Sequence, residues 1–309
     1  MKFISIVSPC YNEEENVESL YNQVKDIFKK LDGYSYEHIF IDNSSKDKTI
    51  PVLKDIAKVD KNVKIIVNSR NFGWITSPIY GLLQANGDAI ILLVSDLQDP
   101  PGLILDFIKK WEEGYKVVIG IKKLSHESRV MFSVRKLYYN LVNRLSGIDL
   151  IKNFTGFGLY DKSIIEILRS LEDPYPYFRG IVAEVGFERA EIEYTQPVRQ
   201  RGVSYSNFYR LFDVAMLGIT NHSKVPLRVA TMLGFSMSLF CVGVSIVYLI
   251  YKLVYWRIFS TGVAPLVIGL FFFSSVQLFF IGIIGEYVGV IFTQVRRRPL
   301  VIEKERINF

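Results

Sequence analysis

Apolar residues are distributed unevenly along this chain of 309 residues. In the last third they form two long runs, 227–250 and 263–290, separated by a short segment that contains Lys252 and Arg257. A helix needs about 20 apolar residues to cross the hydrocarbon core of a bilayer, and each run is long enough to do so. The first 225 residues contain no run of this kind. The pattern therefore predicts a water-soluble head followed by a two-helix transmembrane hairpin.

The head alternates short β-rich runs with segments of helical periodicity. The β-rich runs cover residues 3–8, 38–41, 63–67, 89–94 and 116–120. The fourth run is almost purely apolar, as expected for a strand that is buried on both faces of a parallel sheet. Successive strand–helix units predict an α/β head with a mainly parallel, doubly wound, Rossmann-like sheet.

Polar clusters follow four of these predicted strands, at the ends where such sheets bind ligands. They are Tyr11-Asn12-Glu13, Asp42, Arg70-Asn71 and the segment from Asp96 to Asp99. The carboxylate of Asp96 and the amide oxygen of Gln98 are hard ligands that suit Mg²⁺ or Mn²⁺, with diphosphate oxygens in the remaining positions. Asp99-Pro100-Pro101 is equally typical of a helix start with Asp99 as its N-cap. The two interpretations are compatible, with Asp99 capping and Asp96 on the metal.

The motifs that are missing from the chain and its modest net charge exclude several classes of protein. The head has no G-x-G-x-x-G after its first strand and no P-loop sequence, and its three histidines are scattered. The net charge is +6, but no part of the head is densely basic, so we expect no nucleic-acid partner. The two cysteines, Cys10 and Cys241, exclude a disulfide framework.

Several motifs, in a fixed order over essentially the whole chain, resemble the polyisoprenyl-phosphate glycosyltransferases of family 2. They are the segments 9–13, 42–49, 69–73, 87–88, 96–101, 178–180, 202–204 and 226–228, followed by the two apolar runs. This group contains dolichyl-phosphate mannose synthases and bactoprenol glucosyltransferases. The resemblance implies a GT-A fold. It also implies inverting transfer of one sugar from a nucleotide-sugar, with a UDP-sugar favoured, to a polyisoprenyl phosphate such as undecaprenyl phosphate.

The resemblance also implies roles for individual residues. Those expected to bind the nucleotide-sugar are Pro9, Tyr11, Asn12, Glu13, Asp42, Arg70, Asp88, Asp96 and Gln98. Asp96 and Gln98 are expected to hold Mg²⁺ or Mn²⁺. The residues expected to act in catalysis are Asp96, Arg179 and Arg201, and those expected to bind the acceptor phosphate are Arg199, Arg201 and Ser204. On the residues alone, Tyr11 and Asn12 could be turn formers, Arg70 a surface ion-pair former, and Arg199 with Arg201 a solvated charge pair.

The chain departs from its relatives at three places. Many relatives have an Asp at the position of Val94, which would be a further metal ligand. Many have Asp-Phe-Arg-Leu where this chain has Gly156-Phe157-Gly158-Leu159. The Asp proposed there as catalytic is therefore missing. Many also have Ser-Lys-Tyr in place of Ser204-Tyr205-Ser206, so a lysine that could bind phosphate has no direct replacement.

Four units follow from these patterns: a GT-A domain over 1–205, a juxtamembrane amphipathic helix over 206–226, two transmembrane helices over 227–295 and a tail over 296–309. The helix around 207–223 could equally pack into the head. Positive residues concentrate on the cytoplasmic side of spans, and those flanking the hairpin outnumber those within its loop. We therefore expect an integral membrane protein, of the inner membrane in a bacterium, with its head and both termini in the cytoplasm. Glu286, beside Gly282 and Gly285 in the second run, hints at a homo-oligomer.

Two other functions remain open. A processive polysaccharide synthase uses the same fold, but it usually has a Q-x-x-R-W motif. Here Gln196-Pro197-Val198-Arg199 is followed by Gln200, and two spans are few for a polymer channel. A non-catalytic relative that binds a nucleotide-sugar or a lipid phosphate is the second alternative, and the losses at Val94 and Gly156 favour it. Metal-dependent nucleotide binding without turnover would identify it.

Overall fold

The computed structural model describes all residues except 124–150, 152, 174–175, 198–224, 256–262 and 297. Its described strands form one sheet in the order β7-β5-β6-β4-β1-β2-β3-β8. The strands are β1 Lys2–Cys10, β2 Tyr34–Asp42, β3 Val63–Asn68, β4 Ala89–Leu92, β5 Val117–Lys122, β6 Phe154–Asp161, β7 Arg189–Tyr194 and β8 Glu303–Ile307. The pairs β1–β2, β1–β4, β2–β3 and β5–β7 are parallel, whereas β6 is antiparallel to both β4 and β5. The prediction of a mainly parallel α/β sheet is therefore confirmed.

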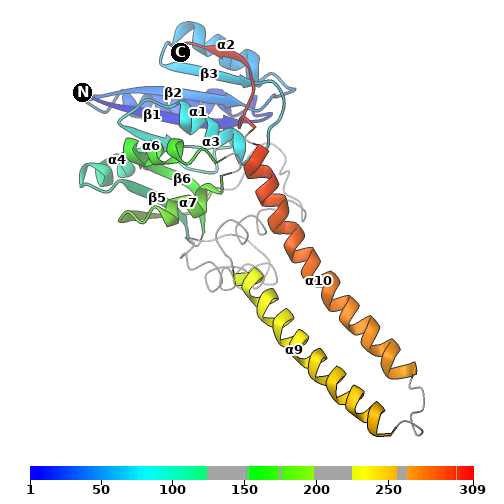
Figure 1. Cartoon of the computed structure of the whole chain (residues 1–309). Coiled ribbons are helices and arrows are strands. Elements are labelled where there is room, and N and C mark those ends of the chain that lie inside the picture. Colours follow the sequence, from blue (N-terminus) through cyan, green and yellow to red (C-terminus); the bar gives the residue numbers. More distant parts are fainter. Residues whose placement is uncertain (124–150, 152, 174–175, 198–224, 256–262, 297) are drawn as a thin grey trace.

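Helices cover both faces of the sheet (Figure 1). They are α1 Val17–Phe28, α2 Thr49–Val59, α3 Thr76–Gln84, α4 Ile104–Glu112, α6 Lys162–Ser170 and α7 Phe178–Glu184, with a 3₁₀ turn η1 at Pro101–Leu103. Side chains of α1, α2 and α4 pack into one core cluster and those of α3, α6 and α7 into another. Neighbouring residues of β2 divide between these clusters, Phe40 facing the first and Ile41 the second. This division is what the alternating side-chain direction of a central strand requires.

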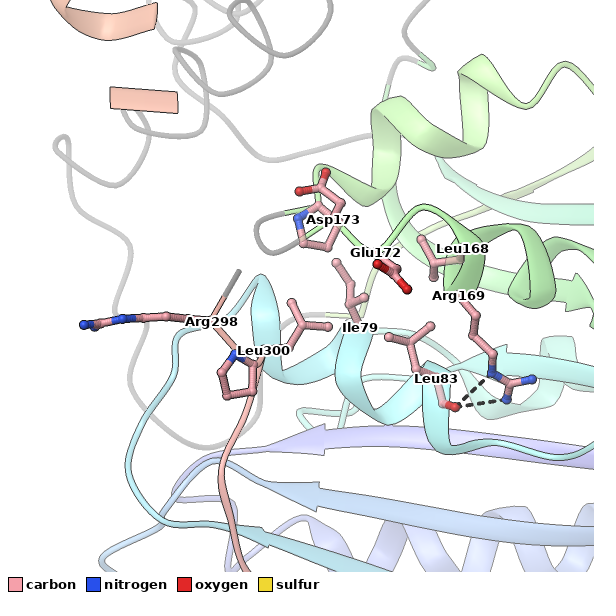
Figure 2. Close-up of a pocket in the computed structure, with 10 residues that line it drawn as sticks. Ile79, Leu83, Leu168, Arg169, Glu172, Asp173, Arg298 and Leu300 are labelled. Atoms are coloured by element: carbon pink, nitrogen blue, oxygen red, sulfur yellow. Dashed lines mark hydrogen bonds between the residues drawn. The ribbon is translucent and has the colours of Figure 1, made fainter. Parts of the chain in front are cut away.

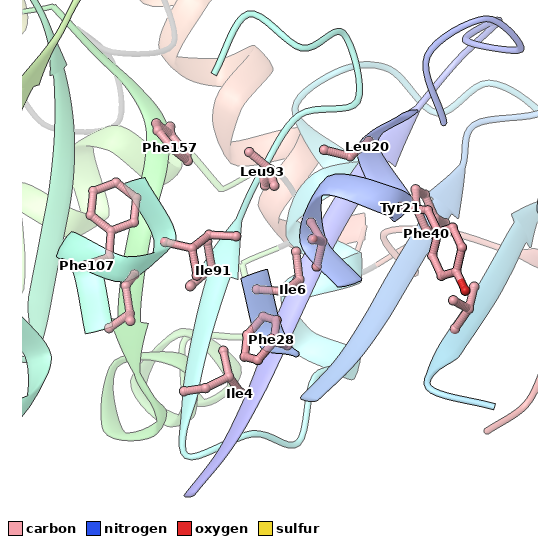
Figure 3. Close-up of a cluster of buried hydrophobic side chains, with 14 of the residues drawn as sticks. Ile4, Ile6, Leu20, Tyr21, Phe28, Phe40, Ile91, Leu93, Phe107 and Phe157 are labelled. Atoms are coloured by element: carbon pink, nitrogen blue, oxygen red, sulfur yellow. The ribbon is translucent and has the colours of Figure 1, made fainter. Parts of the chain in front are cut away.

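The first cluster forms the core beneath α1 and α4 (Figure 3). Ile4, Ile6 and Ile91 come from β1 and β4, at the middle of the sheet, and are fully buried or nearly so. Phe107 of α4 meets Phe157 of β6 edge to face, with ring centroids 4.9 Å apart. The core therefore fixes the strands whose carboxyl ends carry the predicted site.

His38 is a buried polar residue within this core. Its side chain is completely inaccessible, its Nε2 lies 2.9 Å from Ser8 Oγ, and its ring packs on Phe40 with centroids 4.0 Å apart. Burial lowers the pKa of His38 from 6.5 to about 3, and the negative charge of Asp60 only partly opposes this shift. The folded protein therefore keeps His38 neutral at pH values where the unfolded chain takes up a proton.

We expect this difference to destabilise the protein as the pH falls. Stability is unaffected above pH 6.5 and decreases between pH 6.5 and 3, because only the unfolded state binds the proton in that window. Between about pH 7.5 and about pH 5.5, His38 should remove about 1.4 kcal/mol from the free energy of unfolding. Urea titrations of the full chain in detergent at both pH values measure this loss. His38→Gln should show a loss smaller by that amount, and an identical loss in both proteins would refute the assignment.

The strands β6, β7 and β8 were not predicted from the sequence. Residues 296–309 were expected to form a tail, and within them β8 pairs antiparallel with β3 at the edge of the head sheet. Asn308 fastens its end by donating to the carbonyl oxygens of Ala57 and Val63, both at 2.8 Å. The edge of β3 is thus covered, which protects it from pairing with other chains.

Two long helices, α9 Val225–Val254 and α10 Val263–Arg296, project from the head side by side (Figure 1). They coincide with the two apolar runs. Among the described residues, Phe272–Arg296 is long and apolar enough to cross a membrane and is not buried in the protein. Val225–Cys241 is a shorter apolar helical stretch. The two helices are observed, and their crossing of a membrane stays a prediction.

The segment after α10 is seated against the head. With α3 and α6 it lines a cavity of about 240 Å³ (Figure 2), whose walls include Leu300, Ile79 and Leu168. Gln294, in the last turn of α10, donates a hydrogen bond of 2.8 Å to Asp173 Oδ1. None of the predicted site residues that the structure describes lines this cavity. We therefore regard it as the junction of head and hairpin.

Candidate active site

The loops that follow β1 and β2 are joined at the carboxyl end of the sheet. Cys10 and Asp42 are register partners in adjacent parallel strands, so both loops leave the sheet side by side. Asn12 has a left-handed backbone, with φ 56°. Its N–H donates to Ser45 Oγ at 2.9 Å, and its Oδ1 accepts from the N–H of Lys46 at 2.8 Å. Asn12 is thus a turn former that also holds the neighbouring loop.

Asp42 is fully buried at the end of β2. Its Oδ1 accepts from the Ser45 N–H at 2.8 Å and its Oδ2 from the Ser45 hydroxyl at 2.5 Å. Burial raises the pKa of Asp42, and it also raises the pKa of the Cys10 thiol, which lies beside the carboxylate. Asp42 therefore shapes the turn after β2 while remaining at the base of the predicted donor site.

Asn43 is a site residue that the sequence did not single out. Its side chain is buried, and its Nδ2 donates to Asn71 Oδ1 and to the carbonyl of Gly73, both at 3.0 Å. Its Oδ1 accepts from the N–H of Phe72 at 2.9 Å and from Asn68 Nδ2 at 3.0 Å. Asn43 therefore fixes the loop that carries Arg70, and only its place directly after Asp42 could have indicated it.

Replacing Asn43 with alanine should weaken donor binding. Four hydrogen bonds are lost together, and we expect the KM for the donor to rise about tenfold, with a smaller change in kcat, because the loop is no longer held in place. The free energy of unfolding should fall by about 2–3 kcal/mol. Steady-state kinetics and urea titration measure both effects. Asn22→Ala, at an exposed position of α1, is the matched control, and an unchanged KM in Asn43→Ala would contradict the role.

Arg70 is exposed at the rim of the site. Its guanidinium stacks over the ring of Phe72, 4.0 Å from the centroid, and its Nη1 donates to the carbonyl of Asn71 at 3.0 Å. This geometry presents a positive charge on a loop that is itself held by Asn43. Contact of Arg70 with a donor phosphate stays a prediction.

The acidic turn follows β4 and crosses the carboxyl end of the sheet. The N–H of Ser95 lies 3.4 Å from the Pro9 carbonyl, which places the turn beside the end of β1. Leu97 is left-handed, with φ 58°, and the N–H of Gln98 donates to Asp96 Oδ1 at 3.1 Å. Asp96 and Gln98 are both partly exposed. The turn therefore brings the two predicted metal ligands together.

Asp99 does not cap a helix, contrary to that interpretation of the sequence. The turn η1 begins at Pro101, and no side-chain cap bond is present there. Asp99 is instead buried, and its Oδ1 accepts from the Tyr194 hydroxyl at 2.5 Å. Burial raises the pKa of Asp99 to about 6, although the Tyr194 hydrogen bond opposes the shift.

Two of the residues predicted to bind the nucleotide make contacts that stabilise the fold. Asp88 precedes β4 at the amino end of the sheet, and its Oδ2 accepts from the N–H of Phe3 at 2.8 Å. Because ligands bind at the opposite edge, the prediction for Asp88 is wrong. Glu13 is nearly buried and its Oε2 accepts from Asn16 Nδ2 at 2.6 Å, at the start of α1. This contact helps to fix the start of α1, and contact of Glu13 with the donor stays a prediction.

Comparison with known proteins identifies the family. Residues 5–168 match the sequence profile described as Glycosyl transferase family 2. The chain belongs to glycosyl transferase family 2. Its relatives include glycosyltransferase YkcC of Bacillus subtilis, which is 34% identical over 96% of this chain and 92% of that protein. Another is the SfII prophage-derived bactoprenol glucosyl transferase of Shigella flexneri, 33% identical over 98% of this chain and 97% of that one.

Solved structures resemble this family 2 glycosyltransferase less closely. Glucosyl-3-phosphoglycerate synthase from Mycobacterium tuberculosis, solved with Mn²⁺, UDP and glucosyl-3-phosphoglycerate, is 18% identical. It covers 71% of this chain and 78% of its own, with a TM-score of 0.44. The GT-A head and the glycosyltransferase activity follow from membership of the family and from the sheet described above.

The acidic turn of this glycosyltransferase can hold a divalent metal only if the substrate supplies some of the metal ligands. Among the described residues, no group of three His, Cys, Asp or Glu side chains could hold a metal ion alone. Asp96 offers a partly exposed carboxylate and Gln98 an amide oxygen, while Asp99 is already bound by Tyr194. Mg²⁺ commonly takes one or two carboxylates and completes its shell with water and substrate phosphates. The donor set therefore fits Mg²⁺ or Mn²⁺ bound together with a diphosphate.

The structure describes only some of the remaining predicted site residues. Arg179 is half-buried in the first turn of α7, beside Phe178, whose ring meets that of Tyr160 with centroids 5.0 Å apart. Gly156, where many relatives have Asp, lies close by at the carboxyl end of β4, with a left-handed φ of 106°. Arg199, Arg201 and Ser204 lie outside the described residues. Their roles at the acceptor phosphate stay predictions.

Proposed function

We propose that this glycosyltransferase transfers a single sugar, with inversion, from a UDP-sugar to a polyisoprenyl phosphate such as undecaprenyl phosphate. The observation that carries the proposal is the similarity to the SfII prophage-derived bactoprenol glucosyl transferase over 98% of this chain. That similarity includes the hairpin of α9 and α10 as well as the head. A lipid-linked acceptor explains why a head with a nucleotide-sugar fold continues into a long exposed apolar helix.

The proposed topology rests on β8. This strand lies in the same sheet as β1 to β4, so the chain returns to the side of the membrane where the head lies. A chain that leaves and returns crosses the bilayer an even number of times. If α10 is one crossing, α9 is the other, and the head and both termini share the cytoplasmic side. Glu286, exposed on α10, is costly in lipid and would face another subunit of a homo-oligomer.

Catalysis as we propose it needs no general base. The second pKa of a phosphate monoester is about 6, so at neutral pH the acceptor is mostly a dianion and already a competent nucleophile. The absence of an Asp at Gly156 is then tolerable. The enzyme has to align the acceptor oxygen with the anomeric carbon and to neutralise the leaving diphosphate. A divalent metal bound at Asp96 and Gln98 would supply part of that neutralisation, and Arg179 and Arg201 the rest.

Sugar transfer from a panel of labelled UDP- and GDP-sugars tests the proposal. Membranes that contain the full chain are supplied with undecaprenyl phosphate or, as a control, with undecaprenol. We expect one donor to give a product that extracts into organic solvent and carries a single sugar, and only with the phosphate. A product that grows into a polymer would favour the processive synthase. Nucleotide binding without any product would favour the non-catalytic relative.

A further inference from the structure

The hydrogen bond between Asp99 and Tyr194 joins parts of the head that are far apart in the sheet. Tyr194 ends β7, which is separated from β4 by β6 and β5. The chain that leaves β4 at Leu92 therefore passes over the ends of two strands before Asp99 meets the Tyr194 hydroxyl at 2.5 Å. Asp99 and Tyr194 are 4% and 5% exposed, so water does not compete for this bond.

Both partners are held from several sides. The ring of Tyr194 meets that of Phe157 edge to face, with centroids 5.6 Å apart, and its backbone pairs with Lys122 at the end of β5. A Cβ atom at Gly120 would lie 3.0 Å from the Tyr194 ring and 2.8 Å from that of Phe157, so this close packing depends on glycine there. The Tyr194 side chain is therefore held in one position at the carboxyl end of the sheet.

Between these two anchors lies the turn with the predicted metal ligands. On one side the Ser95 N–H is 3.4 Å from the Pro9 carbonyl, and on the other Asp99 is bound by Tyr194. The backbone between them includes the left-handed Leu97 and the contact from the Gln98 N–H to Asp96. A left-handed backbone conformation costs free energy in any residue that has a Cβ atom, as Leu97 does. The surrounding contacts must therefore hold the turn in this shape.

We propose that Asp99 and Tyr194 are positioning residues that hold the turn of Asp96 and Gln98 in its metal-binding shape. This inference rests on the function proposed above. Asp99 does not touch the metal; its carboxylate is the acceptor that fastens the turn, and the hydroxyl of Tyr194 is the donor.

The variants that test this role differ by few atoms. Tyr194→Phe keeps the ring against Phe157 and removes only the hydroxyl. Asp99→Ala removes the acceptor, whereas Asp99→Asn removes the charge but retains an oxygen that can accept. Glu193→Gln is the matched control, because Glu193 is exposed on the same strand and pairs with Lys123 at 3.1 Å.

Mn²⁺ binding to the full chain in detergent, with UDP present, is followed by the electron paramagnetic resonance of free Mn²⁺. We expect Tyr194→Phe and Asp99→Ala to raise the Mn²⁺ concentration at half-saturation about tenfold, the effect of losing one buried hydrogen bond. Asp99→Asn should stay within about twofold of wild type, because its oxygen still accepts the bond. Glu193→Gln should be unchanged, and thermal unfolding should show all variants folded.

Three results would overturn the inference. Tyr194→Phe binding Mn²⁺ like wild type would show that the hydroxyl does not position the turn, and this variant retains the packing even if Asp99→Ala fails to fold. Asp99→Asn as weak as Asp99→Ala would show that charge, not the hydrogen bond, is what matters. A wild-type chain that binds no Mn²⁺ with any nucleotide would overturn the proposed function and this inference with it, whereas the first two results leave the proposed function intact.

Discussion

Asp96→Ala is expected to lower the rate of sugar transfer by a factor of about 10²–10³, the usual effect of removing one group that stabilises developing charge. Among the described residues, Asp96 is the partly exposed carboxylate of the acidic turn, since Asp99 is buried against Tyr194. Its loss leaves Gln98 as the remaining predicted metal ligand. The loss should appear mainly in kcat, because the charge on the leaving diphosphate grows as the bond to the sugar breaks.

The measurement is the initial rate of labelled sugar transfer with saturating Mn²⁺. Asp106→Ala is the matched control, because Asp106 is an exposed acid on α4, shortly after the same turn. We expect Asp106→Ala to transfer sugar at the wild-type rate. Full activity of Asp96→Ala would show that Asp96 has no role in catalysis. It would also contradict the proposal that Asp96 stabilises the leaving diphosphate.

Gly158→Ala is expected to destabilise the head by about 3 kcal/mol or to prevent its folding, because a larger side chain does not fit there. A Cβ atom at Gly158 would lie 2.4 Å from the carbonyl oxygen of Val118 and 3.1 Å from the Cα of Ile119. Both atoms belong to the backbone of β5, which cannot move without disturbing its pairing with β6 and β7.

Urea or thermal unfolding of the full chain in detergent measures the effect. Gly102→Ala is the control, because a Cβ atom there would meet nothing within 4 Å and its φ is not left-handed. Its stability should stay close to that of wild type. A Gly158→Ala protein as stable as the Gly102→Ala protein would mean that β5 and β6 are less tightly packed than the structure indicates.

The sequence predicted the strands that alternate with helical segments and missed the strands that do not follow this alternation. The runs at 3–8, 38–41 and 63–67 alternate with helical segments, and they became β1, β2 and β3. β6 was missed because Gly156 and Gly158 interrupt its apolar pattern, and glycine is a weak strand former except where close approach requires it. β8 was missed because its partner, β3, lies far away in the sequence, and no local pattern reports such a pairing.

The motifs predicted where the site lies on the sheet. They did not predict the hydrogen bonds that join the loops of the site to one another. Asp42 and Asp96 lie at the carboxyl end of the sheet, as expected, because Asp42 is the last residue of β2 and Asp96 lies in the turn that follows β4. Asp88, which was expected to bind the nucleotide-sugar, precedes its strand and so lies at the opposite end. Asn43 and Tyr194 make hydrogen bonds to loops that are far away in the sequence, and no local sequence pattern reports such contacts.

The most direct test of the central claim is the metal dependence of transfer to undecaprenyl phosphate. Membranes with the full chain are treated with EDTA, supplied with the donor found in the panel, and assayed before and after Mg²⁺ or Mn²⁺ is restored. We predict no organic-extractable product in EDTA and recovery of transfer when the metal returns. Undiminished transfer in EDTA would contradict the role given to Asp96 and Gln98. Absence of product with metal and every donor would contradict the proposed function itself.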